Sequence, residues 1–202
     1  IDVHSSTAAE VFGVSIEDVS QDQRRSAKAI NFGLMYGMSA FGLTRQLGIP
    51  RGEAQEYLDT YFARYTGVRD YMDNIKLKAK EDKFVETIMG RRLYLNEINA
   101  ANGLRIQAAE RAAINAPLQG SAADIIKKAM LDIDELILSE MPDVQMIMQV
   151  HDELVFECPK DEINTVSNLI KKEMEQANLP LFPLNIPIVV DFGEADNWSE
   201  AH

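Results

Sequence analysis

The sequence predicts an α+β fold in which a helical lobe is followed by a small antiparallel sheet with flanking helices. Apolar residues recur at helical spacing from residue 5 to about residue 138, with capping residues and glycines between the periodic segments. Beyond residue 144 the pattern changes to short apolar runs that are typical of strands. The chain has 202 residues, 46% of them hydrophobic, which is enough for one large domain or two lobes.

The helical lobe is predicted from residues that start and stop helices. Ser20, followed three residues later by Gln23, is typical of a capping box and opens a helix that ends at Gly37. Pro117 and Gly120 predict an interruption of the last long helix. The segments predicted as helical are 7–12, 21–36, 38–48, 53–80 and about 103–138.

The strands are predicted from apolar runs that flank turn residues. A hairpin that turns at Gly90 is predicted within residues 84–95. A second hairpin is joined by His151, Asp152 and Glu153. Its two strands, an amphipathic helix and a last strand rich in β-branched residues are predicted at 144–150, 154–158, 162–177 and 186–192.

Charge is distributed unevenly along the chain. The net charge is −12, yet residues 1–130 sum to +1 and residues 131–202 to −13. The bulk value argues against a general nucleic-acid coat protein. Residues 24–52 contain five basic side chains and no acidic one, so an anionic partner is expected to meet this stretch.

Composition also limits the location and the kinds of site. A single cysteine, Cys158, excludes an internal disulfide and a cysteine-based zinc site, and it fits a reducing compartment. No run approaches the 18 apolar residues of a membrane span, so we expect a cytoplasmic protein without a membrane partner. The chain starts at Ile1 without an initiator methionine, and we expect it to belong to a longer protein.

The helix predicted at 21–36 carries a stripe of two cations and two rings. These four residues are spaced by four and share one face: Arg24, Lys28, Phe32 and Tyr36. The cations lie near the helix N-terminus, where unpaired N–H groups and the helix dipole favour a triphosphate, and the rings suit a sugar and a base. The alternative is that the cations are merely solvated and the rings belong to the core.

The turn predicted at His151–Glu153 projects carboxylates from a sheet edge. Magnesium takes only one or two protein carboxylates, so Asp152 suits half of such a site. One alternative is solvated charge in a turn. Another is the His-Asp dyad of metal-dependent phosphohydrolases, which is disfavoured because that dyad lies on a helix among several histidines and only His4 and His202 remain.

Three segments resemble motifs of the family A DNA polymerases. RRSAKAINFGLMYG, residues 24–37, matches every position of the family's nucleotide-binding helix, in which R, three residues and K precede N-F-G and Y-G. QVHDELVFE, residues 149–157, resembles the second carboxylate motif of the palm, and RAAINAPLQGSAADI, residues 111–125, is similar to a segment that touches the minor groove of primer-template DNA. The resemblance covers essentially the whole chain and is closest to bacterial enzymes of the Klenow type.

The resemblance implies roles in nucleotide binding. Arg24 would hold the outer phosphates, and Lys28 would neutralise the phosphate nearest the chemistry and could protonate pyrophosphate. Phe32 would pack on the sugar and Tyr36 would lie at the insertion pocket. His4 matches a family histidine near the triphosphate.

The resemblance implies further roles toward metal and DNA. Asp152 would be a ligand of both catalytic magnesium ions, with Glu153 as a nearby acidic residue and His151 near the primer terminus. Three polar residues spaced by four are expected to reach acceptors common to all base pairs in the minor groove: Arg111, Asn115 and Gln119.

The expected function is therefore that of a C-terminal segment of a template-directed DNA polymerase, with residues 1–100 in the fingers and 101–202 in the palm. Its expected partners are primer-template DNA, a deoxynucleoside triphosphate and the upstream part of the same chain. The family's first carboxylate motif, D-Y-S-Q-I-E-L-R, is absent, so these residues alone are expected to be inactive. A noncatalytic DNA- or nucleotide-binding module remains the alternative.

Overall fold

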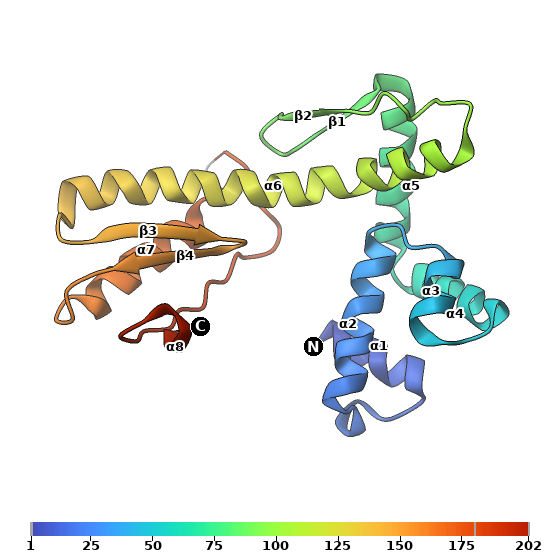
Figure 1. Ribbon diagram of the computed structural model, residues 1–202, viewed down its shortest axis with the longest axis horizontal. Coiled ribbons are helices and arrows are strands. Elements are labelled where there is room, and N and C mark those ends of the chain that lie inside the picture. The colour runs from blue at the N-terminus through green and yellow to red at the C-terminus, as the bar shows by residue number, and fades with distance from the viewer. Residues whose placement is uncertain (1, 180, 202) are drawn as a thin grey trace. The chain divides into compact units, whose positions relative to one another are not determined.

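The computed structural model describes residues 2–179 and 181–201, and the predicted α+β fold is confirmed (Figure 1). The described residues divide into two compact units. The first contains the residues up to Val85 together with Arg92–Ala116, and the second contains Glu86–Arg91 together with the residues from Pro117 onward. No helix of the described chain has both the length and the apolar character needed to cross a bilayer.

The first unit begins with six helical segments. They are α1 (Val3–Phe12), η1 (Ile16–Asp18), α2 (Gln21–Met35), α3 (Ala40–Leu47), α4 (Arg51–Arg64) and α5 (Thr66–Asp82). The predicted capping box opens α2, because the Gln23 amide donates to Ser20 Oγ and the Ser20 amide donates to Gln23 Oε1. A buried cluster from α2, α3 and α4 holds these helices together: Ile30, Leu34, Leu43, Ala54 and Leu58.

The single helical segment predicted at 53–80 is wrong in one respect, because α4 and α5 are separate helices. Tyr65 lies between them with φ −106° and ψ 63°, outside the helical region. Thr66 and Gly67, both weak helix formers, follow it and weaken any continuation.

The predicted hairpin at Gly90 is confirmed. Strands β1 (Phe84–Glu86) and β2 (Arg92–Tyr94) flank a turn in which Gly90 has φ 78°, a value that favours glycine. Residues 86–91 belong to the second unit, where the Ile88 amide donates to Ser121 Oγ at 2.9 Å.

The predicted interruption near Pro117 and Gly120 is wrong, because α6 (Gly103–Glu140) continues through both residues. The surrounding segment is rich in alanine, the strongest helix former, which offsets the hydrogen bond that Pro117 removes. Gly120 serves a different purpose, since a Cβ at this position would lie 2.5 Å from Cγ2 of Thr87. Glycine therefore permits the 86–91 turn to approach α6 closely.

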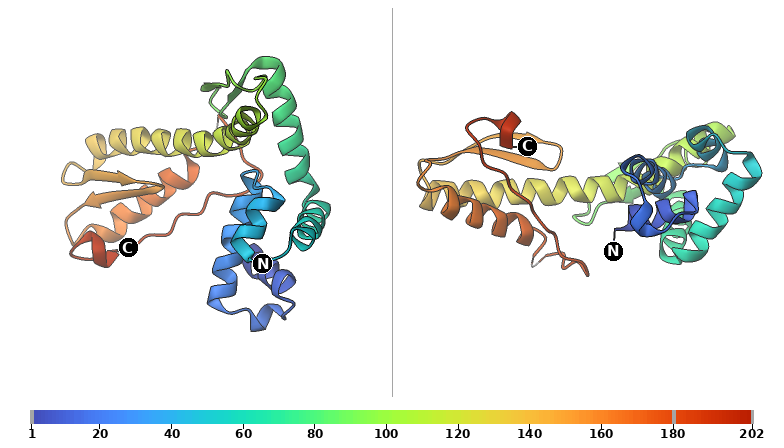
Figure 2. Two further views of the ribbon diagram at one scale, coloured as in Figure 1. Left: turned by 45° about the vertical axis from the view of Figure 1, so that its right-hand side comes forward. Right: turned by 90° about the horizontal axis from the view of Figure 1, so that it is seen from below.

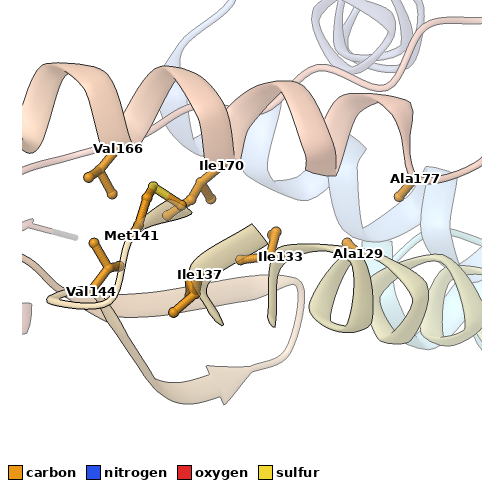
Figure 3. Packing of buried hydrophobic residues seen from close by; sticks show 8 residues of the cluster. All are labelled: Ala129, Ile133, Ile137, Met141, Val144, Val166, Ile170 and Ala177. Carbon is orange, nitrogen blue, oxygen red and sulfur yellow. The ribbon is translucent and has the colours of Figure 1, made fainter. Parts of the chain in front are cut away.

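The second unit is built around the predicted second hairpin. Strands β3 (Gln145–Val150) and β4 (Glu153–Glu157) are antiparallel, and Val150 pairs with Glu153 at the turn. Helix α7 (Ile163–Gln176) and the C-terminal part of α6 pack with the hairpin around one core (Figures 2 and 3). The buried members are Ala129, Ile133, Ile137, Met141, Val144, Val166, Ile170 and Ala177.

The last predicted strand, 186–192, is wrong. The segment forms no strand. Within it, the Val190 amide donates a hydrogen bond to a side chain, Glu175 Oε1, at 3.1 Å. Ile186 and Val189 are each 72% exposed. β-Branched residues favour a half-buried pleated surface, and the described residues offer this segment no neighbouring strand. The chain ends in the short α8 (Trp198–Ala201).

Candidate active-site elements

One face of α2 presents the predicted stripe of cations and rings. Lys28 Nζ lies 5.9 Å from the Phe32 ring centroid, and the Phe32 and Tyr36 rings are 6.1 Å apart at an interplanar angle of 23°. Residues on the opposite side dock the helix with no exposed surface: Ala27, Ile30 and Leu34. Phe32 is 38% exposed, so its ring is not a core side chain.

Helix α1 adds His4 to this surface through a buried polar contact. The His4 and Phe32 ring centroids are 5.8 Å apart. The Asn31 amide lies 3.1 Å from His4 Nδ1 and 3.0 Å from Thr7 Oγ1, and both Asn31 and Thr7 are buried. When the amide donates to Nδ1, the proton of the neutral imidazole lies on Nε2.

Asn31 has no role in the sequence-based prediction, although it lies inside the quoted N-F-G motif. Its position could have indicated a role, because it is a polar residue four positions after buried Ala27, on the buried side of an amphipathic helix. Its position fixes how α1 and α2 meet. Asn31 therefore supports the position of His4 beside α2.

Arg24 is held by a residue that the sequence did not indicate. Its Nε lies 2.6 Å from Asp2 Oδ2. Asp2 also accepts hydrogen bonds from the Ser5 hydroxyl at 2.6 Å and from the His4 amide at 3.1 Å, and so caps α1. The Ser5 hydroxyl first, and Arg24 second, hold the pKa of the Asp2 carboxyl well below its usual range. Among the described residues Lys28, by contrast, forms no salt bridge, and it is exposed.

The β3–β4 turn presents the predicted carboxylate. Asp152 and His151 are exposed at its tip, and Glu153 is the first residue of β4. His151 has φ 54°, a left-handed conformation that is uncommon outside glycine, and its carbonyl accepts from Gln149 Nε2 at 2.5 Å. The indole of Trp198 donates to Glu153 Oε1 at 2.8 Å.

The hairpin fits part of a magnesium site. In the described part of the chain, no group of three or more His, Cys, Asp or Glu side chains is arranged to hold a metal. Exposed Asp152 and partly buried Glu153 are nevertheless consecutive carboxylates, which is the donor chemistry that magnesium uses when water and phosphates complete its octahedron. The donor set therefore fits a partial site.

The predicted DNA-contacting residues lie on α6. Arg111 and Asn115 belong to the first unit, and Gln119 belongs to the second. Arg111 and Gln119 are exposed, whereas Oδ1 of Asn115 is buried and has no hydrogen-bond partner in the described part of the protein. Arg111 also lines a cavity of about 410 Å³ in the first unit, together with Phe41 and Lys76.

Comparison with known proteins identifies the family. A model described as "DNA polymerase family A" matches residues 1–200. The chain belongs to DNA polymerase family A. DNA polymerase I of Pseudomonas aeruginosa is 56% identical over 202 residues, and that of Geobacillus stearothermophilus is 45% identical over 201 residues; each alignment covers all of this chain and 22% of the relative.

A solved family A structure is also similar. The polymerase domain of Pol1 from M. smegmatis, solved in complex with DNA primer-template and dNTP, has a TM-score of 0.91 and 42% identity. The similarity covers 99% of this chain and 35% of that one. This family A chain thus spans about a fifth of the length of the curated relatives named above and about a third of the solved domain.

The structure brings eight of the predicted site residues together in two groups, and the other three, Arg111, Asn115 and Gln119, lie along α6. The first group lies on α1 and α2 in the first unit and comprises His4, Arg24, Lys28, Phe32 and Tyr36. The hairpin group lies in the second unit and comprises His151, Asp152 and Glu153. Three supporting residues were not predicted: Asp2, Asn31 and Trp198.

Proposed function

We propose that this chain is the part of a template-directed DNA polymerase that binds the incoming deoxynucleoside triphosphate and carries one carboxylate group of a two-metal site. The observation that carries the proposal is the convergence of His4, Lys28 and Phe32 on one exposed surface of α1 and α2. The M. smegmatis neighbour, which was solved with primer-template DNA and dNTP, supports it.

Cationic side chains would bind the phosphates of the nucleotide, and aromatic rings would contact its sugar and base. Arg24 lies at the end of the first turn of α2, where the helix dipole favours an anion, and Lys28 would add an exposed cation one turn later, at the middle of the helix. Arg24 would break its ion pair with Asp2 and bind the outer phosphates instead. Phe32 and Tyr36, whose ring centroids are 6.1 Å apart, would then offer ring surfaces to the sugar and the base.

The metal chemistry would be divided between this chain and the rest of the polymerase. Asp152, with Glu153 beside it, would hold magnesium, and the second carboxylate would come from outside these 202 residues. When bound, the ions stabilise the attacking and leaving oxygens of an in-line phosphoryl transfer. The protein's own contribution is to fix the carboxylates on a short, paired turn.

The DNA would be contacted by α6 and by the hairpin turn. Arg111, Asn115 and Gln119 would face the minor groove, and His151 would lie near the primer terminus. The unpaired, buried Oδ1 of Asn115 supports this assignment, because such an atom is costly unless a ligand supplies its donor.

We further propose that residues 1–100 are fingers and 101–202 are palm. A polymerase that acts on bacterial chromosomal DNA would work in the cytoplasm, at the nucleoid.

A comparison of two cations on α2 tests the proposal. In the whole polymerase, Lys28→Ala should slow single-nucleotide addition by about 10²- to 10³-fold, because Lys28 stabilises charge that develops in the transition state. Primer-template affinity, measured by equilibrium titration, should change far less. Arg25→Ala is the matched control, since Arg25 is exposed on the same helix and paired only at 3.7 Å with Asp22. Equal losses of rate and DNA affinity would make Lys28 a duplex phosphate contact instead.

A further inference from the structure

The C-terminal segment contacts the β3–β4 hairpin that carries Asp152 and Glu153, called the carboxylate hairpin below. Trp198 lies 45 residues after Glu153, and its indole Nε1 donates to Glu153 Oε1 at 2.8 Å. Figure 2 shows α8 beside the β3–β4 hairpin, within the second unit. Trp198 is the only tryptophan of the chain. The contact joins the tail to the residue next to Asp152.

The segment that carries Trp198 is closed on itself. A Cβ at Gly193 would lie 2.0 Å from the carbonyl oxygen of Ala201, so only glycine permits this approach. The Glu200 amide donates to both the carbonyl and the side-chain oxygen of Asn197, at 3.2 Å each. Trp198 is therefore presented by a compact loop, and not by an extended tail.

A second contact ties the loop to the body of the unit. Lys160, which follows β4, forms an ion pair with Asp196. Both side chains are exposed, so this pair contributes little to stability by itself. The indole contact is the one that reaches the carboxylate hairpin.

An indole is well suited to orient a carboxylate that also faces a cation. It donates one hydrogen bond and carries no charge, so it does not compete with a metal as lysine or arginine would. A carboxylate accepts several interactions at once, and a hydrogen bond at one oxygen leaves its charge intact. In metal sites, partners of this kind fix the orientation of the carboxylates that face the ion.

We propose that Trp198 is a positioning residue that holds the Glu153 carboxylate beside Asp152, so that the C-terminal loop forms part of the divalent-cation site. This inference rests on the proposed polymerase function. It predicts that the affinity of the hairpin for divalent cations depends on the C-terminal loop. Binding of the nucleotide by α2 is not involved.

The test uses the whole polymerase bound to a primer that ends in a dideoxynucleotide, with primer-template and the next dNTP, so that no chemistry occurs. Mn²⁺ binding is measured by the loss of the free-ion electron paramagnetic resonance signal. Trp198→Phe removes the N–H and keeps an aromatic ring, and it should weaken Mn²⁺ binding about 10-fold. Lys160→Ala, which breaks only the exposed ion pair, is the matched control and should leave the affinity unchanged.

A double-mutant cycle separates positioning from general damage. In a Glu153→Gln background, Trp198→Phe should have no further effect on Mn²⁺ affinity, because the indole acts through the carboxylate. A loss as large as that in the wild-type background would overturn the inference. So would an unchanged affinity in the single Trp198→Phe variant.

Asp152→Ala distinguishes this inference from the proposed function. If Asp152→Ala abolishes primer extension while Trp198→Phe leaves Mn²⁺ binding unchanged, the positioning role is wrong and the polymerase assignment stands. If Asp152→Ala leaves extension intact, the hairpin does not hold the catalytic ions and both proposals fail.

Discussion

The turn that carries Asp152 holds His151 in a conformation that favours glycine, and this can be measured. His151 is the first of two residues between paired Val150 and Glu153, and it has φ 54°. A left-handed conformation costs a non-glycine residue about 1 to 2 kcal/mol. Glycine avoids this cost, but it loses more conformational entropy on folding than alanine does, which lowers the free energy of unfolding by about 0.5 to 1 kcal/mol. His151→Gly should therefore be more stable than His151→Ala by about 0.5 to 1 kcal/mol.

Urea unfolding of the 202-residue chain measures this difference. Trp198 is the only tryptophan, and its indole donates a hydrogen bond to Glu153 beside the turn, so its fluorescence reports on the hairpin. Glu157, exposed at the end of β4 and without a positive φ, supplies the control pair. There the alanine variant should be the more stable one. If alanine is also the more stable choice at position 151, the turn does not adopt the left-handed conformation in solution.

Further outcomes are expected for Phe32, Asp2 and Asp152. In the whole polymerase, Phe32→Tyr should raise incorporation of 3′-deoxy terminators relative to normal nucleotides, because the added hydroxyl replaces the missing one; unchanged discrimination in a competition assay would remove Phe32 from the sugar pocket. Asp2→Asn should tighten triphosphate binding at low salt by releasing Arg24, as measured by titration. Because hydrogen bonds from the Ser5 hydroxyl and then from Arg24 lower the pKa of Asp2, the stability that these contacts contribute is present above the unfolded-state pKa near 4 and should be lost as the pH falls from there toward the lower folded-state pKa. The purified 202-residue chain should not extend a primer, and once the rest of the polymerase is restored Asp152→Ala should abolish extension without weakening triphosphate binding.

The elements that the sequence predicts well are those in which several local preferences agree. Helix α2 has a capping box at Ser20, an apolar stripe and a terminal glycine, and all three specify the same helix. The β1–β2 hairpin likewise follows from Gly90, whose positive φ the turn requires. Both predictions depend only on neighbours within a few residues.

The errors arise where distant residues decide the outcome. Gly120 looks like a helix breaker, but its role is set by Thr87, more than thirty positions earlier in the chain. The 186–192 segment has the composition of a strand, yet a strand needs a partner that no local pattern supplies. The contacts of Arg24 with Asp2 and of Glu153 with Trp198 are likewise long-range, 22 and 45 residues apart, and no spacing rule indicates them.

The two units differ in formal charge, and this difference bears on the functions proposed for them. By formal charge the first unit is neutral and the second carries −12. The acidic unit contains Asp152 and Glu153, and its field attracts divalent cations and repels the phosphates of DNA. We therefore expect DNA to approach this hairpin only when cations, from bound metal or from other parts of the polymerase, compensate the repulsion. The neutral unit bears no such penalty, and we expect its cations on α2 to hold a triphosphate. Nucleotide binding should accordingly survive in these 202 residues by themselves, whereas primer binding at the hairpin should require the longer polymerase.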